Sequence, residues 1–404
     1  MILLPLRFTQ QVYFHGWIHM NDVLERTQLY DWHMKHGDVI PFAGWEMPVR
    51  YTDIREEHMA VRNSIGMFDT SHMSRFFIKG LQASEFLQTL TTNNVSKLKI
   101  NGGQYTTCLN EKGGIHDDLT LYRIGEEEYI WITNAANGPK IKSHLLKHSS
   151  GFDVEVIDKS REITMIAVQG PNALKLMNKM AGHDVSEYPR FSSYPVKLAG
   201  YACYLCRTGY TGEDGVEILL LDTKMNDEGK KRAIAFWEEL LDQGKEYNLK
   251  PCGLGSRDST RLEAGFVLYG HELDEETSPI EARIPYAVKF KVDPHYIGYD
   301  VARNHKKEGG IRKTRIGLLM IDRGIPREHY PLLRNGKQIG EVTSGGLAPT
   351  INKGIALAYV TPETVDLGDI VEVDIKGRMR KAEVTKWPFY DAALYGASRT
   401  KHPN

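Results

Sequence analysis

Apolar positions recur with a helical period in several separate segments of the chain. In residues 53–65 the period follows Thr52, carries Glu56 and Glu57 in its first turn and stops before Gly66. A hydroxyl or acid at the start and a glycine at the end are typical of helix termini. The same period predicts further helices. Their ranges are 81–90, 171–181, 228–243 and 255–264.

Other segments alternate apolar and polar residues with the period of a β-strand. The predicted strands are 74–79, 105–109, 117–124, 128–134, 163–168, 198–206 and 215–221. They mix with the helices without the regular strand–helix–strand order of a doubly wound sheet, so the pattern favours the α+β class. The sequence has no glycine-rich dinucleotide motif and no P-loop, which argues against a resident FAD, NAD or ATP site of those types.

The last part of the chain changes character. Residues 303–315 are basic, polar and glycine-containing, as in a linker. Beyond them, Asn335-Gly336 and Gly377 give the turn signals of β-hairpins between alternating strands. We therefore expect a small all-β barrel or sandwich over residues 315–390.

Length and charge narrow the class of protein. A chain of 404 residues exceeds one hydrophobic core, so we expect two or three domains. A formal net charge of −1 argues against a broad nucleic-acid-binding face, and no apolar run reaches the roughly 20 residues that cross a membrane. We therefore expect neither nucleic acid nor membrane as a partner. Residues 1–19 lack the features of a signal or transit peptide and are interpreted as an extension or an over-long gene start.

The cysteines do not predict a metal centre. Cys203 and Cys206 form a C-x-x-C pair, but they lie in an alternating segment where residues three apart point to opposite faces. The sequence has no second pair of this kind and no His/Asp/Glu spacing typical of a metal site. We expect buried, reduced thiols and no metal.

A predicted hairpin brings polar side chains together. If residues 125–127 form its turn, the register places Asp118 opposite Asn134. Asp118, Tyr122 and Asn134 then share one face of the hairpin, with Asp117 on the other face. A structural interpretation fits the same residues, with a strand-start aspartate bonded to backbone amides and Asn134 in a turn.

Two further segments carry charged residues that could bind a ligand. In RTGYTGEDGVEI, Glu217 lies on the strand face opposite to its apolar neighbours, where a carboxylate can accept paired hydrogen bonds from an amino-pyrimidinone. A solvated glutamate in a polar hairpin explains the pattern as well. In GLGSRDSTRLEAG, Arg257 and Arg261 share a helix face and Asp258 precedes Arg261 by three residues, which surface ion pairs also explain.

Residues 41–51 and 66–76 combine aromatic residues, methionine, glycine and proline. This composition suggests loops that line a cavity, although loops that only cover a core look similar. His72, in the second segment, is interpreted as a structural histidine.

These segments, in this order, resemble the aminomethyltransferase (T-protein) family of the glycine cleavage system. The resemblance runs from about residue 27 to residue 390. It rests on the motifs FAGWEMPVRY, GMFDTSHM, LNEKGGIHDDL, NAAN, QGP, CRTGYTGEDGVE, GLGSRDSTRLEAG and EVTSGGLAPT. It implies a folate-binding body of two interleaved α+β domains and a C-terminal β-barrel. The implied boundaries are an N-terminal extension at 1–26, the body at 27–305 and the barrel at 311–395.

The resemblance also implies roles for single residues. The second aspartate of the DD pair, Asp118, matches the family's catalytic acid, and Glu217 and Arg257 match residues that contact folate. Other expected folate contacts are Asn134, Tyr105, Tyr122, Tyr210 and Met73. Tyr390, or the nearby Tyr395, matches a substrate-contacting tyrosine. The chain departs from the family at residues 1–24 and at YIG, 296–298.

The implied reaction transfers the methylene of an aminomethyl group from the lipoyl arm of H-protein to tetrahydrofolate. Ammonia and dihydrolipoyl protein are released, and neither a metal nor a covalent enzyme nucleophile is required. Two alternatives stay open: another tetrahydrofolate-dependent demethylase of the same superfamily, and a non-enzymatic folate-binding scaffold. We expect a cytoplasmic location, or the mitochondrial matrix if the source is eukaryotic.

Overall fold

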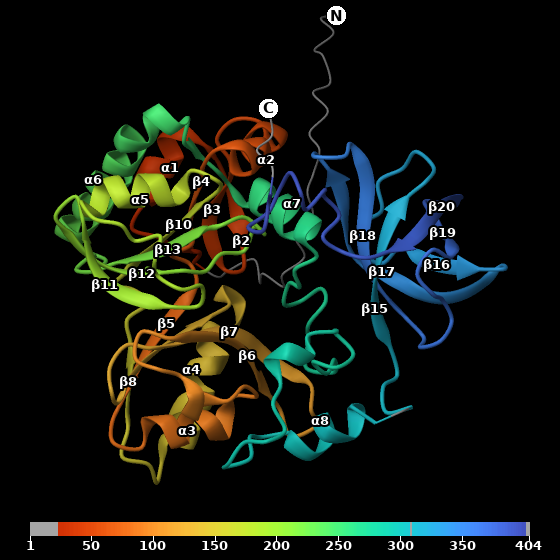
Figure 1. Cartoon of the computed structure of the whole chain (residues 1–404), viewed down its shortest axis with the longest axis horizontal. Coiled ribbons are helices and arrows are strands. Elements are labelled where there is room, and N and C mark those ends of the chain that lie inside the picture. The colour runs from red at the N-terminus through yellow and green to blue at the C-terminus, as the bar shows by residue number, and fades with distance from the viewer. Residues whose placement is uncertain (1–22, 308, 401–404) are drawn as a thin grey trace, which may run out of the picture.

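The computed structural model describes residues 23–307 and 309–400, which build two larger sheets, a small sheet and a closed barrel (Figure 1). The α+β class and the C-terminal barrel are confirmed. Most of the predicted extension at 1–26 lies outside the described residues, since the description begins at Val23.

The first large sheet has six strands in the order β11-β12-β13-β10-β4-β14. The strands are β4 Gly66–Asp69, β10 Thr164–Gln169, β11 Ser193–Leu198, β12 Tyr201–Cys206, β13 Gly215–Leu220 and β14 Lys250–Pro251. Helices α5 (Ala173–Ala181) and α6 (Asp227–Gly244) pack on it through a continuous apolar core. This core buries large side chains such as Trp237 and Phe236 completely, which supplies most of the stability of this half of the body.

The second large sheet has five strands in the order β6-β7-β8-β5-β9. They are β5 Ser74–Lys79, β6 Gly103–Leu109, β7 Ile115–Arg123, β8 Glu128–Thr133 and β9 Glu155–Asp158. Helices α3 (Ala83–Leu90) and α4 (Gly138–Ser149) cover one face through a second core around Trp131. A third core, which includes Tyr122 and Leu219, joins the other face to the six-stranded sheet.

The two sheets are interleaved along the chain. After β4 the chain leaves the six-stranded sheet, builds all five strands of the second sheet, and returns at β10, which pairs with β4. The sheet is completed only when β14 pairs with β4 at Lys250 and Gly66. The interleaved arrangement expected from the family resemblance is therefore confirmed.

A three-stranded sheet, α1 and α2 lie beside the six-stranded sheet (Figure 1). The elements are β1 Glu25–Arg26, α1 Tyr30–His36, β2 Asp38–Phe42, β3 Trp45–Arg50 and α2 Ile54–Asn63. Most of residues 41–51 is thus strand, so the loop interpretation of this segment was wrong. The tight turn at Ala43-Gly44, where both φ angles are positive, pairs β2 with β3. Helix α2 is capped by Asp53, whose side chain accepts from two backbone amides, rather than by Thr52.

The C-terminal barrel is closed in the order β15-β18-β17-β16-β19-β20. Its strands are β15 Thr314–Met320, β16 Pro331–Arg334, β17 Lys337–Ala348, β18 Lys353–Val360, β19 Ile370–Ile375 and β20 Arg378–Thr385. Both predicted hairpin turns are present, since Asn335-Gly336 and Lys376-Gly377 have positive φ angles between paired strands. The predicted linker at 303–315 overlaps the end of α8 (Tyr299–His305) and the start of β15.

Helix α7 (Leu254–Ala264) joins the body to the barrel (Figure 1). Its Leu262 packs against apolar side chains of β17 and β18. Its Arg261 pairs with Asp258 at 2.7 Å and with Glu272 at 3.1 Å, and donates to Ser344 Oγ of β17. Arg261 is 2% exposed, so the interpretation of these charges as surface ion pairs was wrong.

Candidate active site

The β7–β8 hairpin has the predicted register. Tyr122 pairs with Ile130 and Leu119 with Thr133, and Asn134 follows directly after β8. The register therefore brings the Asn134 amide beside Asp118, and Nδ2 donates to Asp118 Oδ1 at 2.8 Å. The other carboxyl oxygen, Oδ2, accepts from the Tyr105 hydroxyl at 2.9 Å. Tyr105 is in reach because β6 pairs with β7, which sets it opposite Thr120 on the face that Asp118 shares.

The neighbouring Asp117 is fully buried on the other side of β7. Its Oδ1 accepts from Asn134 Nδ2 at 2.8 Å and from Asn137 Nδ2 at 2.7 Å, and its Oδ2 accepts from the Thr133 hydroxyl. Asn134 thus donates from one amide nitrogen to both carboxylates. This shared donor fixes the position of Asp118 relative to a buried acid.

Both carboxyl groups titrate above their usual range. Burial is the main cause that raises the pKa of Asp117, and the adjacent charge of Asp118 raises it further. Burial also raises the pKa of Asp118, while the hydrogen bonds from Tyr105 and Asn134 oppose the rise. Asp118 nevertheless keeps some accessible surface, so a ligand can reach it.

Glu217 on β13 approaches from the six-stranded sheet. It is 7% exposed, so the interpretation as a solvated glutamate was wrong. Tyr122 donates to Thr208 Oγ1 at 2.6 Å, and Thr208 in turn donates to Glu217 Oε2 at 2.6 Å. Burial raises the pKa of Glu217, and Thr208 and the positive charge of Arg257 counteract this. In the described part of the chain Thr208 is the only hydrogen-bond donor to this carboxylate, which leaves Oε1 available.

Arg257 on α7 has equally few partners. Its guanidinium lies over the Tyr210 ring, 4.9 Å from the centroid, and its Nη2 is 3.8 Å from Met73 Sδ. None of the ion pairs found among residues 23–307 and 309–400 includes Arg257. Burial lowers its pKa, and the charge of Glu217 raises it, so the two groups are electrostatic neighbours. Burial raises the pKa of the Tyr210 hydroxyl, and the charges of Arg257 and Asp118 also act on it, so Tyr210 lies near both groups.

The structure thus brings eight of the expected site residues into one cluster, which we call the polar cluster. Its members are Asp118, Asn134, Tyr105, Tyr122, Glu217, Arg257, Tyr210 and Met73. Sequence reasoning missed Thr208, which links Glu217 to Tyr122, and Tyr286, whose ring lies 5.9 Å from that of Tyr105. Thr208 lies within the segment RTGYTGEDGVEI singled out above, but its residue type gives no sign of this role, and no motif marks Tyr286.

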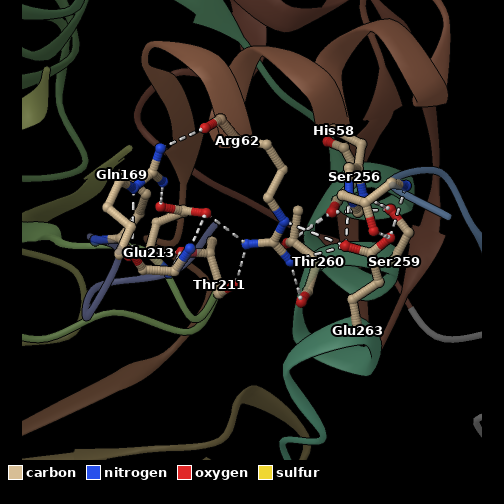
Figure 2. A network of polar contacts seen from close by, with 12 residues as sticks. His58, Arg62, Gln169, Thr211, Glu213, Ser256, Ser259, Thr260 and Glu263 are labelled. Carbon is tan, nitrogen blue, oxygen red and sulfur yellow. Dashed lines mark hydrogen bonds and ion pairs between the residues drawn. The ribbon is translucent and has the colours of Figure 1, made fainter. Parts of the chain in front are cut away.

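Tyr390 lies elsewhere. Its ring packs over the Arg62 guanidinium at 4.5 Å, in a buried ionic network, and its hydroxyl lies beside Gly212 in the loop that carries Tyr210. Figure 2 shows Arg62 pointing between Glu213 and Glu263 at the centre of this network. The interactions of Tyr390 therefore do not place it in the polar cluster.

His72 is buried beside Arg257, with an edge-to-face contact to Phe42. Burial, together with the charge of Arg257, lowers its pKa to about 3. The imidazole is therefore neutral at physiological pH, and its Nδ1 has no hydrogen-bond partner among the described residues.

Cys203 and Cys206 point into different cores, as predicted, and are free thiols. Burial raises the pKa of each to about 12. Within residues 23–307 and 309–400 there is no group of three or more His, Cys, Asp and Glu side chains that could hold a metal ion. In the same ranges no helix combines the length and apolar character needed to span a bilayer.

Two shallow surface hollows, of about 430 and 390 Å³, lie away from the polar cluster. One is lined by α3 together with Asp293 and Pro294, and the other by residues around Gly80 and Asp153. Neither hollow marks the candidate site, which is therefore defined by the side chains of the polar cluster.

Comparison with known proteins identifies the class. Residues 29–292 match the family model described as the GCVT N-terminal domain, and residues 313–391 match that of the glycine cleavage T-protein C-terminal barrel domain. The domain boundaries at 27–305 and 311–395 stay predictions. The chain belongs to the glycine cleavage T-protein family.

Individual relatives agree over most of the chain. The chain is 43% identical to an aminomethyltransferase of Bacillus cytotoxicus, over 91% of this chain and 98% of that protein. It is 40% identical to a probable aminomethyltransferase of Pyrococcus horikoshii, over 93% of this chain and all of that protein. The crystal structure of glycine cleavage system aminomethyltransferase T from Bartonella henselae superposes with a TM-score of 0.83 at 32% identity, covering 93% of this chain and all of that one. The expectation of an aminomethyltransferase enzyme is therefore confirmed.

Proposed function

We propose that the polar cluster binds tetrahydrofolate and receives the aminomethyl-lipoyl arm of H-protein. The observation that carries the proposal is the unused hydrogen-bonding capacity of Arg257 and Glu217. A guanidinium surrounded by protein normally satisfies its donors, as Arg62 and Arg261 do. Arg257 instead contacts a methionine sulfur and an aromatic face, while Thr208 is the one donor to Glu217 among the residues that the structure describes.

The chemistry of these groups fits a reduced pterin. A carboxylate with a free oxygen can accept paired N–H bonds from an amino-pyrimidinone edge, and a guanidinium can donate to a carbonyl or ring nitrogen. The aromatic rings of Tyr105 and Tyr210 supply flat apolar surface next to these charges. Neutral His72 offers one more unpaired nitrogen beside Arg257.

Asp118 is the proposed catalytic residue. In the reaction the aminomethyl carbon loses its bond to sulfur, releasing the lipoyl thiol, and its bond to nitrogen, releasing ammonia. Two folate nitrogens bind the carbon and give up their protons to the two leaving groups. A carboxylate near this carbon stabilises the developing positive charge and orients or deprotonates the attacking nitrogen.

The fixed position of Asp118 suits this role. Asn134 and Tyr105 each hold one of its oxygens, so little reorganisation is needed when charge develops. Much of the remaining rate enhancement should come from holding two large substrates in register.

The test is an assay with aminomethyl-lipoyl H-protein and tetrahydrofolate that follows ammonia release. Turnover that requires both substrates supports the proposal. Tight tetrahydrofolate binding without ammonia release would instead favour a demethylase with another substrate or a folate-binding scaffold. We also propose a cytoplasmic location, which the bacterial and archaeal sources of the relatives support.

A further inference from the structure

Residues near the C-terminal limit of the described chain lie on the loop that carries two residues of the proposed site. We call residues 391–400 the C-terminal segment and residues 207–214 the site loop. The backbone amide of Ala397 donates to the carbonyl of Gly212 at 2.9 Å, and that of Gly396 donates to Glu213 Oε1 at 2.9 Å. Arg190 also binds the C-terminal segment, through the carbonyl of Ala397 at 2.9 Å.

Arg399 makes the strongest of these contacts. Its guanidinium forms an ion pair with Glu213 and donates to the backbone carbonyl of Arg62 at 3.2 Å. The Glu213 side chain is 1% exposed and pairs with Arg62 at 3.1 Å on its other oxygen. A buried carboxylate held by two cations is a rigid anchor, because neither partner can be replaced by water.

Packing restricts the site loop at the same point. Gly212 has a φ of +81°, and a Cβ atom there would lie 2.6 Å from the Tyr390 hydroxyl and 2.8 Å from Ala264 Cβ. The backbone of the loop is thus enclosed by Tyr390, α7 and the C-terminal segment. Tyr390 thus contacts both Arg62 and the site loop.

The anchored loop also carries Thr208 and Tyr210. Thr208 bridges Glu217 and Tyr122, and Tyr210 lies beneath the Arg257 guanidinium with its hydroxyl bonded to the carbonyl of Val267. A shift of the loop would move Thr208 and Tyr210 together.

We propose that Arg399 is a positioning residue for the tetrahydrofolate site. Its ion pair with Glu213 holds the site loop, and the loop in turn holds Thr208 and Tyr210 at the geometry that binds the pterin. This inference rests on the proposed function, because it assigns the purpose of the loop to that site. Arg399 itself touches no substrate.

The experiment compares three full-length variants: Arg399→Ala, Arg399→Gln and Arg399→Lys. Arg399→Ala should raise the KM and Kd for tetrahydrofolate about tenfold while saturating kcat changes less than threefold, because small misplacements of binding groups weaken binding. Arg399→Lys keeps the charge and should restore values near wild type. Arg399→Gln keeps one hydrogen-bond donor for Glu213. Its KM and Kd for tetrahydrofolate can be measured even if the alanine variant does not fold.

The matched control is Arg334→Ala. Arg334 forms a partly exposed ion pair with Asp369 at 2.9 Å within the barrel, away from the site loop. The Arg334→Ala substitution should leave the KM for tetrahydrofolate unchanged. An Arg399 variant with a lower melting temperature but a wild-type Kd for tetrahydrofolate would overturn the proposal, since Arg399 would then be merely structural.

Amide hydrogen exchange separates this proposal from the proposed function. In Arg399→Ala and Arg399→Gln the amides of residues 207–214 should exchange faster than in wild type, while those of β18 should not change. If wild-type protein lacks turnover but the loop responds in this way, the proposed function fails while the anchoring of the site loop by Arg399 stands. Unchanged exchange of the loop would refute the positioning whatever the activity.

Discussion

Replacing Asp118 by asparagine tests the proposed chemistry most directly. The substitution keeps the shape of the side chain and removes its charge and its ability to take a proton. General acid–base catalysis contributes about 10²- to 10⁴-fold, or about 2.7–5.5 kcal/mol of barrier. We therefore expect kcat to fall by at least about a hundredfold, while the Kd for tetrahydrofolate stays within about threefold because Glu217 and Arg257 are intact.

The structure also predicts how the stability of this variant depends on pH. Both oxygens of Asp118 accept hydrogen bonds, and an asparagine can accept only one of them, which costs about 1 kcal/mol. In the opposite direction, burial raises the pKa of Asp118. The folded protein then binds a proton that the unfolded chain has already released, so in wild type the ionised group lowers stability as pH rises above about 4.

Because of these two effects, the difference in stability between Asp118→Asn and wild type should change with pH. Below about pH 4, where Asp118 is protonated in both states, Asp118→Asn should be about 1 kcal/mol less stable than wild type. As the pH rises to neutrality the difference should shrink or reverse, because the variant has no charge to bury. Urea denaturation at several pH values measures this difference, and the H-protein assay measures turnover.

Asp38→Asn is the matched control, since Asp38 is exposed and pairs with Arg50 at 2.7 Å. Its turnover should equal that of wild type. If Asp118→Asn kept more than a tenth of wild-type kcat with lipoyl-bound substrate, the assignment of Asp118 as catalytic residue would be wrong. A stability deficit that grew with pH would contradict the argument from burial.

Three other substitutions test separate parts of the structure. Glu217→Gln removes one or two charge-assisted hydrogen bonds, worth about 1.5–3 kcal/mol. The Kd for tetrahydrofolate, measured by calorimetry, should therefore rise about 10- to 100-fold. A Kd within threefold of wild type would show that Glu217 does not bind the folate. Arg261→Met leaves the fully buried Glu272 without its ion-pair partner and should lower the free energy of unfolding, measured with urea, by about 3–5 kcal/mol, whereas a loss below 1 kcal/mol would show that this buried pair contributes little to stability. Gly265→Ala combines a positive φ with a Cβ 2.3 Å from Trp387, so it should destabilise by about 1–3 kcal/mol more than Gly270→Ala, which has a positive φ and open space; equal losses would show that packing at Trp387 is not restrictive.

The hairpin shows what local sequence can predict about this site. A short turn fixes the register of two strands, so the pairing of Asp118 with Asn134 follows from the position of the turn alone. The alternation of side chains then decides which of the two aspartates faces Tyr105. That Asn134 would bind both carboxylates was not predictable, because Asn134 lies beyond the strand, where alternation no longer applies.

Arg257 and Arg261 show where local reasoning stops. Both lie on one face of α7, as the helical period predicts, yet their surroundings differ completely. Arg261 pairs with Glu272 and donates to Ser344 of the barrel, both of which lie further along the sequence, so its hydrogen-bond donors are satisfied. Arg257 meets a tyrosine ring and a methionine instead. Helical spacing fixes the direction of a side chain, but only the tertiary fold decides what it meets.

The placement of Tyr390 has the same origin. The family resemblance identifies a tyrosine near the end of the sequence, but it does not reveal that the C-terminal segment packs on the site loop. That arrangement depends on Arg62 and Glu213, which are far from residue 390 in sequence and form their ion pair only in the folded protein.

The late pairing of β14 with β4 bears on how this chain can be synthesised and divided. About 180 residues separate Gly66 from Lys250, the partners in this pairing, and the whole five-stranded sheet lies between them. During translation one edge of β4 stays unpaired until residue 251 has left the ribosome, although the five-stranded sheet can form earlier. A cut between β4 and β10 would therefore not yield two folded halves.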